Sequence, residues 1–161
     1  MIHIKKSQAA DTRSAKEKVS KETLLLSSIQ HIGDVQKALH WIIGQLMDIA
    51  EKHDYTKIDN IDEYYTDFAL MQAGGLVDFK AAHWFKHIHL LERHHLTDRV
   101  PDDVNLFDVL ERIADCVMAG MGRSGNVYPD TLTADVLMKA FNNTYELLQS
   151  VVIVEEEPKP S

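Results

Sequence analysis

The sequence has little of what marks secreted, membrane or nucleic-acid-binding proteins. Its single cysteine, Cys116, allows no internal disulfide and fits a reducing cytosol. No apolar run reaches the ~18 residues of a membrane span, and the polar start of the chain lacks the apolar centre of a secretory signal. The net charge is -8 without a long basic patch, which argues against general nucleic-acid binding. We therefore expect a cytoplasmic protein that does not associate with membranes.

Length and composition indicate one soluble domain with two polar ends. The chain has 161 residues, of which 45% are hydrophobic and 26% charged. Residues 1–21 are charged and small, which predicts a flexible arm or a loose first helix. Residues 22–154 form the predicted helical domain, and residues 155–161 form an acidic, proline-containing tail.

Apolar spacing predicts an all-α fold, a single-domain bundle of five or six helices. We expect helices at about 24–53, 61–73, 77–96, 106–121 and 133–151. The segment 151–154 is too short to decide between strand and coil, and the glycine-rich segment 120–129 is predicted to be a flexible loop. Two buried stripes are predicted, one on the first helix and one on the fourth: Ile32, Val35, Leu39, Ile42, Leu46 and Ile49, then Leu106, Leu110, Ile113 and Val117.

Histidine is the one residue type in unusual supply. The chain has nine, and five of them lie between residues 83 and 95. On a continuous helix His83, His87 and His94 share one face, with the last two about 10.5 Å apart along the axis. That spacing suits two metals ~3.5–4 Å apart, or one ligand plus one substrate contact. His95 can replace His94 if the helix loosens, and His89 is predicted to point away and be exposed.

Two further positions offer ligands. His53 and Asp54 present an imidazole nitrogen and a carboxylate oxygen from adjacent residues, which together can bind a divalent metal. The same pair can also be an ordinary helix end, where histidine complements the helix dipole and aspartate starts a turn. Asp115 lies in an apolar helical setting and needs a partner, which can be a metal, Arg112, Lys57 or a helix N-terminus.

The order of these residues resembles the HD-domain superfamily of metal-dependent phosphohydrolases. His53-Asp54-Tyr-Thr-Lys57 resembles its His-Asp-x-x-Lys signature, and His94-His95 resembles the paired histidines of two-metal members. The set is closer still to an uncharacterised bacterial and phage family of HD-like proteins, with the resemblance covering about 31–120. The residues that carry this second resemblance are His31, His53, Asp54, Thr56, Lys57, Glu63, Tyr65, His87, His94 and His95.

The resemblance implies an all-α phosphohydrolase that uses one or two divalent metals. The implied metal ligands are His53, Asp54, His87, His94, His95, Asp115 and His31. Such a ligand set accepts manganese, iron, nickel, cobalt or zinc. His31 conflicts with the periodicity, because a continuous helix separates it from His53 by about 33 Å. Either the helix breaks near Gly33 or Gly44, or His31 has another role.

The implied mechanism is hydrolysis of a phosphate ester by metal-activated water. Asp54 holds the metal, Lys57 neutralises phosphate charge, and Glu63 or Asp62 orients the water or acts as general base. Arg93 and Arg123 are candidate phosphate contacts. The expected substrate is a small phosphorylated molecule, with a nucleotide the first choice.

Two other functions remain open. The first is a non-catalytic binding or regulatory protein that keeps an HD-like scaffold. The second is an all-α nucleotide pyrophosphohydrolase, a class that favours Glu-x-x-Glu pairs, which are absent around the predicted site. Exposed apolar positions on the first helix, Trp41 among them, also allow a homodimer.

Overall fold

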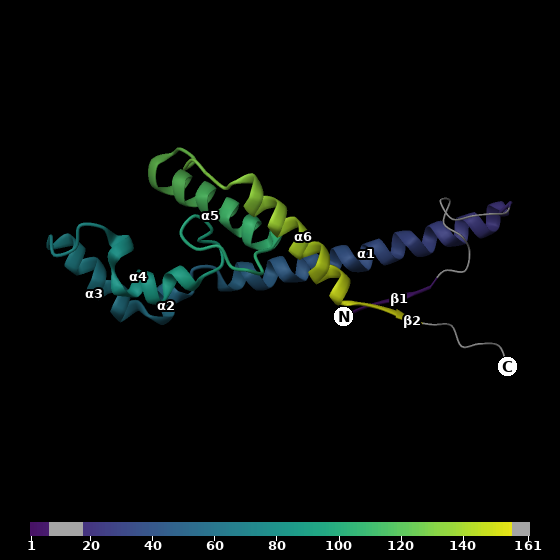
Figure 1. The fold of residues 1–161 in the computed structure, drawn as a ribbon, viewed down its shortest axis with the longest axis horizontal. Helices are drawn as coiled ribbons and strands as arrows, with labels where there is room; N and C mark the ends of the chain where they lie inside the picture. The colour runs from purple at the N-terminus through teal and green to yellow at the C-terminus, as the bar shows by residue number, and fades with distance from the viewer. Residues whose placement is uncertain (7–17, 156–161) are drawn as a thin grey trace. The chain divides into compact units, whose positions relative to one another are not determined.

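A computed structural model describes residues 1–6 and 18–155 and is mostly helical (Figure 1). The prediction of an all-α fold is confirmed, with one parallel strand pair added. The α-helices are α1 (Lys21–Lys52), α2 (Thr56–Asp59), α3 (Ile61–Gln72), α4 (His83–His87), α5 (Leu106–Ser124) and α6 (Ala134–Ser150). Two 3-10 turns, η1 (Phe79–Ala81) and η2 (His89–Leu91), and strands β1 (Ile2–Lys5) and β2 (Val152–Glu155) complete the elements. None of the described helices is both long enough and apolar enough to cross a bilayer.

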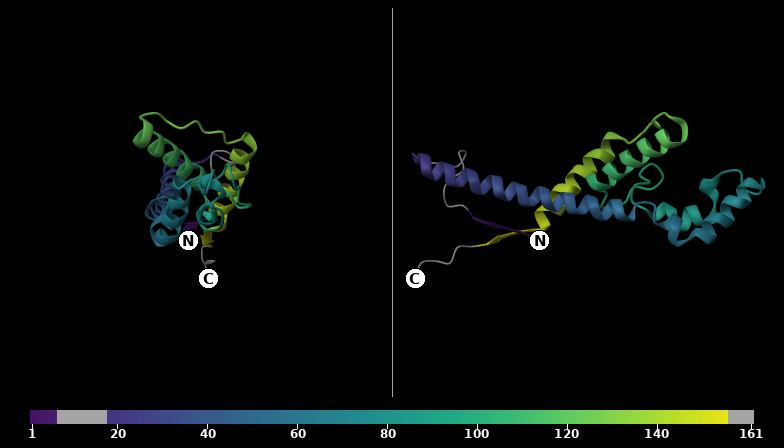
Figure 2. Two further views of the ribbon diagram at one scale, coloured as in Figure 1. Left: turned by 90° about the vertical axis from the view of Figure 1, so that its left-hand side faces the viewer. Right: turned by 180° about the vertical axis from the view of Figure 1, so that it is seen from behind.

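The described chain forms two compact units, Met1–Leu46 with Tyr145–Ser161, and Met47–Thr144. In the first unit β1 and β2 pair in parallel and lie side by side in both views of Figure 2, with Ile2 opposite Val152. Residues 2–5 are therefore a strand, and the expectation of a flexible arm or loose helix is wrong for them. The rest of that arm from 7 to 17, and the tail from 156 to 161, lie outside the described residues. The predicted domain boundaries stay a prediction.

Helix α1 starts where Ser20 accepts a hydrogen bond from the backbone N–H of Thr23, an N-terminal cap. It then continues without interruption to Lys52, as the apolar spacing predicted. The expected burial of its stripe is wrong. No side chain of Lys21–Lys52, all of which the structure describes, is buried, and Ile32 and Leu39 are 55% and 51% exposed.

The second unit has two small apolar cores. One is built on Trp84 and Phe85 of α4, with Tyr64 of α3 stacked on Trp84 at 4.3 Å between ring centroids. The other joins Val104 and Val109 at the start of α5 to Ala140 of α6. The two cores fix the segments that carry the histidines and the start of α5.

The helix predicted at about 77–96 is wrong, because the segment is broken into η1, α4 and η2. Ala82 has an extended backbone with ψ 147°, and Glu92 is extended with ψ 139°. The N–H of Trp84 donates to the carboxylate of Asp67 at 2.7 Å, and Asp78 caps η1. The segment is therefore stabilised by the burial of Trp84 and Phe85 and by hydrogen bonds to side-chain acceptors, in place of the backbone hydrogen bonds of a regular helix.

Helix α5 begins at a capping box, in which Asn105 and Asp108 exchange backbone-to-side-chain hydrogen bonds. It continues to Ser124, so the loop predicted to begin at residue 120 is wrong. Gly120 is buried in the helix, where an added Cβ would lie 2.4 Å from the carbonyl oxygen of Asn126. The predicted core face is also wrong in part, since Leu110 and Ile113 are exposed.

Candidate metal centre

The end of α1 turns His53 and Asp54 out of the helix. Asp54 has φ 57°, a left-handed conformation that aspartate and asparagine tolerate better than most residues. Its side chain forms an ion pair with Lys57, at the start of α2. Burial opposes ionisation of Asp54, but the hydrogen bond and charge of Lys57 outweigh it and lower the pKa of Asp54. This carboxylate is therefore ionised at neutral pH.

Glu92 connects this turn to the histidine-rich segment. Its carboxylate accepts hydrogen bonds from the backbone N–H of Asp54 at 3.0 Å, from the N–H of Thr56 at 3.2 Å and from the Thr56 hydroxyl. Burial raises the pKa of Glu92, but the hydrogen bonds with His89 and Thr56 outweigh it and lower the pKa to about 2. Glu92 thus holds the 54–56 turn through a charged acceptor.

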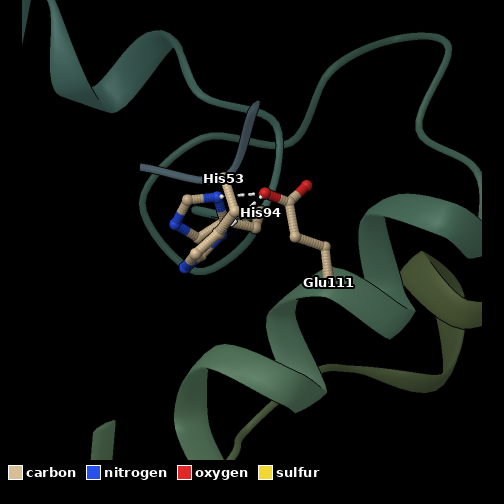
Figure 3. A group of neighbouring side chains, drawn as sticks. All are labelled: His53, His94 and Glu111. Atoms are coloured by element: carbon tan, nitrogen blue, oxygen red, sulfur yellow. Dashed lines mark hydrogen bonds and ion pairs between the residues drawn. The ribbon is translucent and has the colours of Figure 1, made fainter. Parts of the chain in front are cut away.

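Glu111 of α5 faces two imidazole rings (Figure 3). Its Oε1 lies 2.9 Å from Nδ1 of His53 and 3.1 Å from Nδ1 of His94. Burial opposes ionisation, but the hydrogen bonds with His94 and His53 lower the pKa of Glu111. Burial of His94 disfavours its charged form, yet Glu111 and Asp54 raise the pKa of His94.

Three more side chains complete the cluster around Asp54. Its Oδ1 lies 3.6 Å from Nε2 of both His89 and His94. His95 packs against His94 with ring centroids 4.2 Å apart. Burial, and then the electrostatic interactions with His94 and His89, lower the pKa of His95 to about 4, so its ring is neutral at pH 7. Asp115 approaches His53, with Oδ1 3.8 Å from Nε2.

These side chains form four overlapping groups of three, and within each group the ligand atoms lie within 4.8 Å of one another. The groups are His53–His94–Glu111, Asp54–His94–His95, His53–Asp54–Asp115 and Asp54–His89–Glu92. Among the described residues of the cluster, Oδ1 of Asp54 and Nε2 of His95 are buried without a hydrogen-bond partner, whereas Nδ1 of His94 forms an ion pair with Glu111 at 3.1 Å. Buried polar atoms normally have one, so these atoms fit ligation of a cation. A mixed nitrogen and carboxylate set suits a divalent transition metal.

The structure brings five of the seven predicted metal ligands together: His53, Asp54, His94, His95 and Asp115. It does not bring in the other two. His87 is exposed on α4 and its ring packs on His83 at 4.6 Å, while His31 is exposed on α1 in the first unit. Neither belongs to any group found among the described residues.

The residues predicted to take part in catalysis or phosphate binding do not all lie at the cluster. Lys57 lies at the cluster, bonded to Asp54, whereas Glu63 and Asp62 are exposed in the first turn of α3. The guanidinium of Arg93 donates to Asp103 and to the buried Asp108. Arg123 is exposed in the last turn of α5. Their roles in catalysis and phosphate binding stay predictions.

Sequence reasoning missed His89, Glu92 and Glu111. The expectation that His89 is exposed is wrong, since it is 4% exposed and its ring stacks on Trp84 at 4.7 Å. One signal for Glu111 was present, because it precedes Asp115 by one helical turn and so shares its face. Nothing in the spacing distinguished Glu92 from a solvated glutamate.

Comparison of the chain with protein-family models, curated proteins and solved structures gave no significant match.

Proposed function

We propose that the protein is a metal-dependent phosphohydrolase whose centre is the cluster around Asp54. The observation that carries the proposal is the convergence of four imidazoles and four carboxylates. Two buried atoms of this cluster, Oδ1 of Asp54 and Nε2 of His95, have no hydrogen-bond partner among the described residues. The resemblance of His53-Asp54-x-x-Lys57 to the HD signature supports the reaction class. A bound divalent ion would polarise a phosphoryl oxygen and lower the pKa of a bound water towards ~7.

The chain's own residues supply the rest of the chemistry. His53, Asp54 and Asp115 form one of the four groups and would hold the ion, with Glu111 orienting the imidazoles of His53 and His94 from α5. Lys57 lies against Asp54, and in this proposal it neutralises charge on a phosphate oxygen.

A cavity of about 450 Å³ borders the cluster and fits a small substrate. Glu92 and Glu111 belong both to this cavity and to the metal-ligating groups. The lining has five carboxylates and two cationic side chains: Asp48, Asp59, Glu92, Asp108 and Glu111, against Lys52 and Arg93. An anionic substrate meets repulsion there unless a cation is bound, so phosphate binding should require the metal.

The test is elemental analysis of untagged protein purified without chelator, compared with Asp54→Asn and His53→Gln. Asparagine tolerates the left-handed conformation at residue 54 while removing the ionised carboxylate. We expect about one or two equivalents of transition metal in the wild-type protein, and a loss in both variants. His87→Gln is the matched control, since His87 is exposed and outside the groups, and should retain the metal.

Hydrolysis is measured next, on a panel of nucleotides and other phosphate esters, with the metal that the elemental analysis identifies. Activity that disappears in Asp54→Asn and persists in His87→Gln supports the proposal. Wild-type protein that takes up no metal even after soaking in manganese or nickel would refute it. Metal without hydrolysis would favour a non-catalytic binding protein.

A further inference from the structure

Apolar residues recur along α1 at alternating steps of three and four. The positions run from 25 to 49, and Ser28 is the one polar member: Leu25, Ser28, Ile32, Val35, Leu39, Ile42, Leu46 and Ile49. The mean spacing of 3.5 residues is the repeat of a left-handed coiled coil, in which such a row packs against a second helix. We call these eight positions the α1 seam.

The seam is most open in its first half. Leu25, Ile32, Val35 and Leu39 are between 43% and 57% exposed. Ile42, Leu46 and Ile49 are half-buried. A row of large aliphatic side chains left in water at this spacing needs a partner surface.

The first unit holds α1 by the opposite face. Gln30 donates to the carbonyl oxygen of Lys5 at 2.6 Å, and Lys37 donates to that of His3 at 2.9 Å. Residues 30 and 37 lie one heptad apart on the side of the helix away from the seam. Strand β1 therefore contacts α1 on the face away from the seam, and these contacts do not involve the seam.

The length of the seam selects its partner. It spans 24 residue steps, about 36 Å at 1.5 Å per residue. Helices α5 and α6 have 19 and 17 residues, about 28 and 26 Å. Among the described helices, α1 with its 32 residues is the one that can match the seam along its whole length.

The positions flanking the seam favour self-association. They carry no Asp, Glu, Lys or Arg between residues 24 and 50: Leu24, Ile29, His31, Gln36, Ala38, Ile43, Gln45 and Ala50. Two identical helices therefore meet without like-charge repulsion, and flanking isoleucines widen the apolar contact. We propose that the α1 seam packs against the α1 seam of a second copy of this chain, making a homodimer.

The test is the molar mass of the full-length protein, measured by light scattering and by sedimentation equilibrium with a chelator present. The chelator removes association through metal, so this result is independent of the proposed function. Leu39→Glu places a charge on the seam, and Leu26→Glu makes the same substitution at an exposed leucine off the seam. We expect a dimer for the wild-type chain and for Leu26→Glu. For Leu39→Glu we expect a dissociation constant at least about 100-fold higher, tenfold for each copy.

Circular dichroism checks that each variant keeps its helix content. If Leu39→Glu does not fold, Ile32→Asn decides, because it adds a polar group to the seam without charge. A dimeric wild-type chain and control with weakened seam variants support the proposal. A monomeric wild-type chain, or equal effects of Leu26→Glu and the seam variants, would overturn it.

Discussion

Replacing Glu92 by glutamine tests whether this carboxylate fastens the 54–56 turn. Glu92 is 12% exposed at its side chain and accepts hydrogen bonds from two backbone N–H groups and one hydroxyl. Glutamine keeps the size and one acceptor oxygen but removes the charge. Hydrogen bonds to a charged acceptor are worth about 1.5–3 kcal/mol, more than those to a neutral one.

The pKa of Glu92 gives the magnitude. It falls from an ordinary 4.5 to about 2 in the folded protein. At 1.36 kcal/mol per pKa unit, this difference corresponds to about 3 kcal/mol of stability at neutral pH. We expect Glu92→Gln to lower the free energy of unfolding by about 2–3 kcal/mol at pH 7, measured by urea denaturation with a chelator present.

The pH dependence follows from the sign of this change. Because the folded-state pKa lies below the unfolded value, the contribution is fully present above about pH 4.5 and is lost as the pH falls towards 2. Near pH 3 the difference in the free energy of unfolding between wild type and variant should fall to less than half of its value at pH 7. Glu63→Gln, an exposed glutamate on α3, should show little gap at either pH. Equal stabilities at pH 7, or a gap that ignores pH, would refute the reasoning.

Two further predictions concern α5 and α1. Asp108→Ala should lower the free energy of unfolding by about 3–5 kcal/mol in urea denaturation, because it removes the buried carboxylate that pairs with Arg93. Asp103→Ala removes the exposed partner of the same arginine and should lower it by less than about 1 kcal/mol. Gly120→Ala should destabilise the protein by about 1–3 kcal/mol, since the added Cβ would clash with the backbone of Asn126. Gly44→Ala should stabilise it by about 1 kcal/mol, because an added Cβ there meets no atom within 4 Å. Thermal unfolding that ranks either pair in reverse contradicts these assignments.

The long helices could be predicted because their apolar periodicity is sustained over many residues. α1, α3, α5 and α6 all lie close to their predicted ranges. Periodicity cannot show whether a stripe is buried within one chain. In the stripe of α1, Ile32, Val35 and Leu39 are exposed and the later positions are only half-buried. The same repeat that predicted a core therefore becomes the basis for a contact with a second chain.

The candidate site could be predicted only where neighbours in sequence are also neighbours in space. His53 and Asp54 are adjacent, and His94 and His95 are adjacent, and all four converge. The link between the pairs could not be predicted, since it depends on irregular backbone. Ala82, Ile88 and Glu92 have non-helical backbone conformations, so the segment from 82 to 96 is not one regular helix. Distances expected for a helix therefore do not apply to it.

The charge balance of the cluster explains why one set of residues can serve both stability and ligation. Four carboxylates gather there, from Asp54, Glu92, Glu111 and Asp115. The pKa values of the first three are lowered, and Lys57 is the cationic side chain bonded directly to one of them. The neutral form of His95 leaves a ring lone pair available rather than a positive charge.

An excess of carboxylates beside the neutral imidazole of His95 is the electrostatic condition that a divalent cation relieves. The charges of Glu92 and Glu111 are partly compensated by hydrogen bonds to neighbouring groups. Oδ1 of Asp54 has no hydrogen-bond partner among the described residues. Asp54 also belongs to three of the four groups, so a cation on that oxygen contacts residues from the end of α1 and from the 89–95 segment together. Ligation would then strengthen the same link that Glu92 makes by hydrogen bonds. Because Glu92→Gln removes a carboxylate from one of the groups, metal should stabilise the variant less than it stabilises the wild-type protein in urea denaturation.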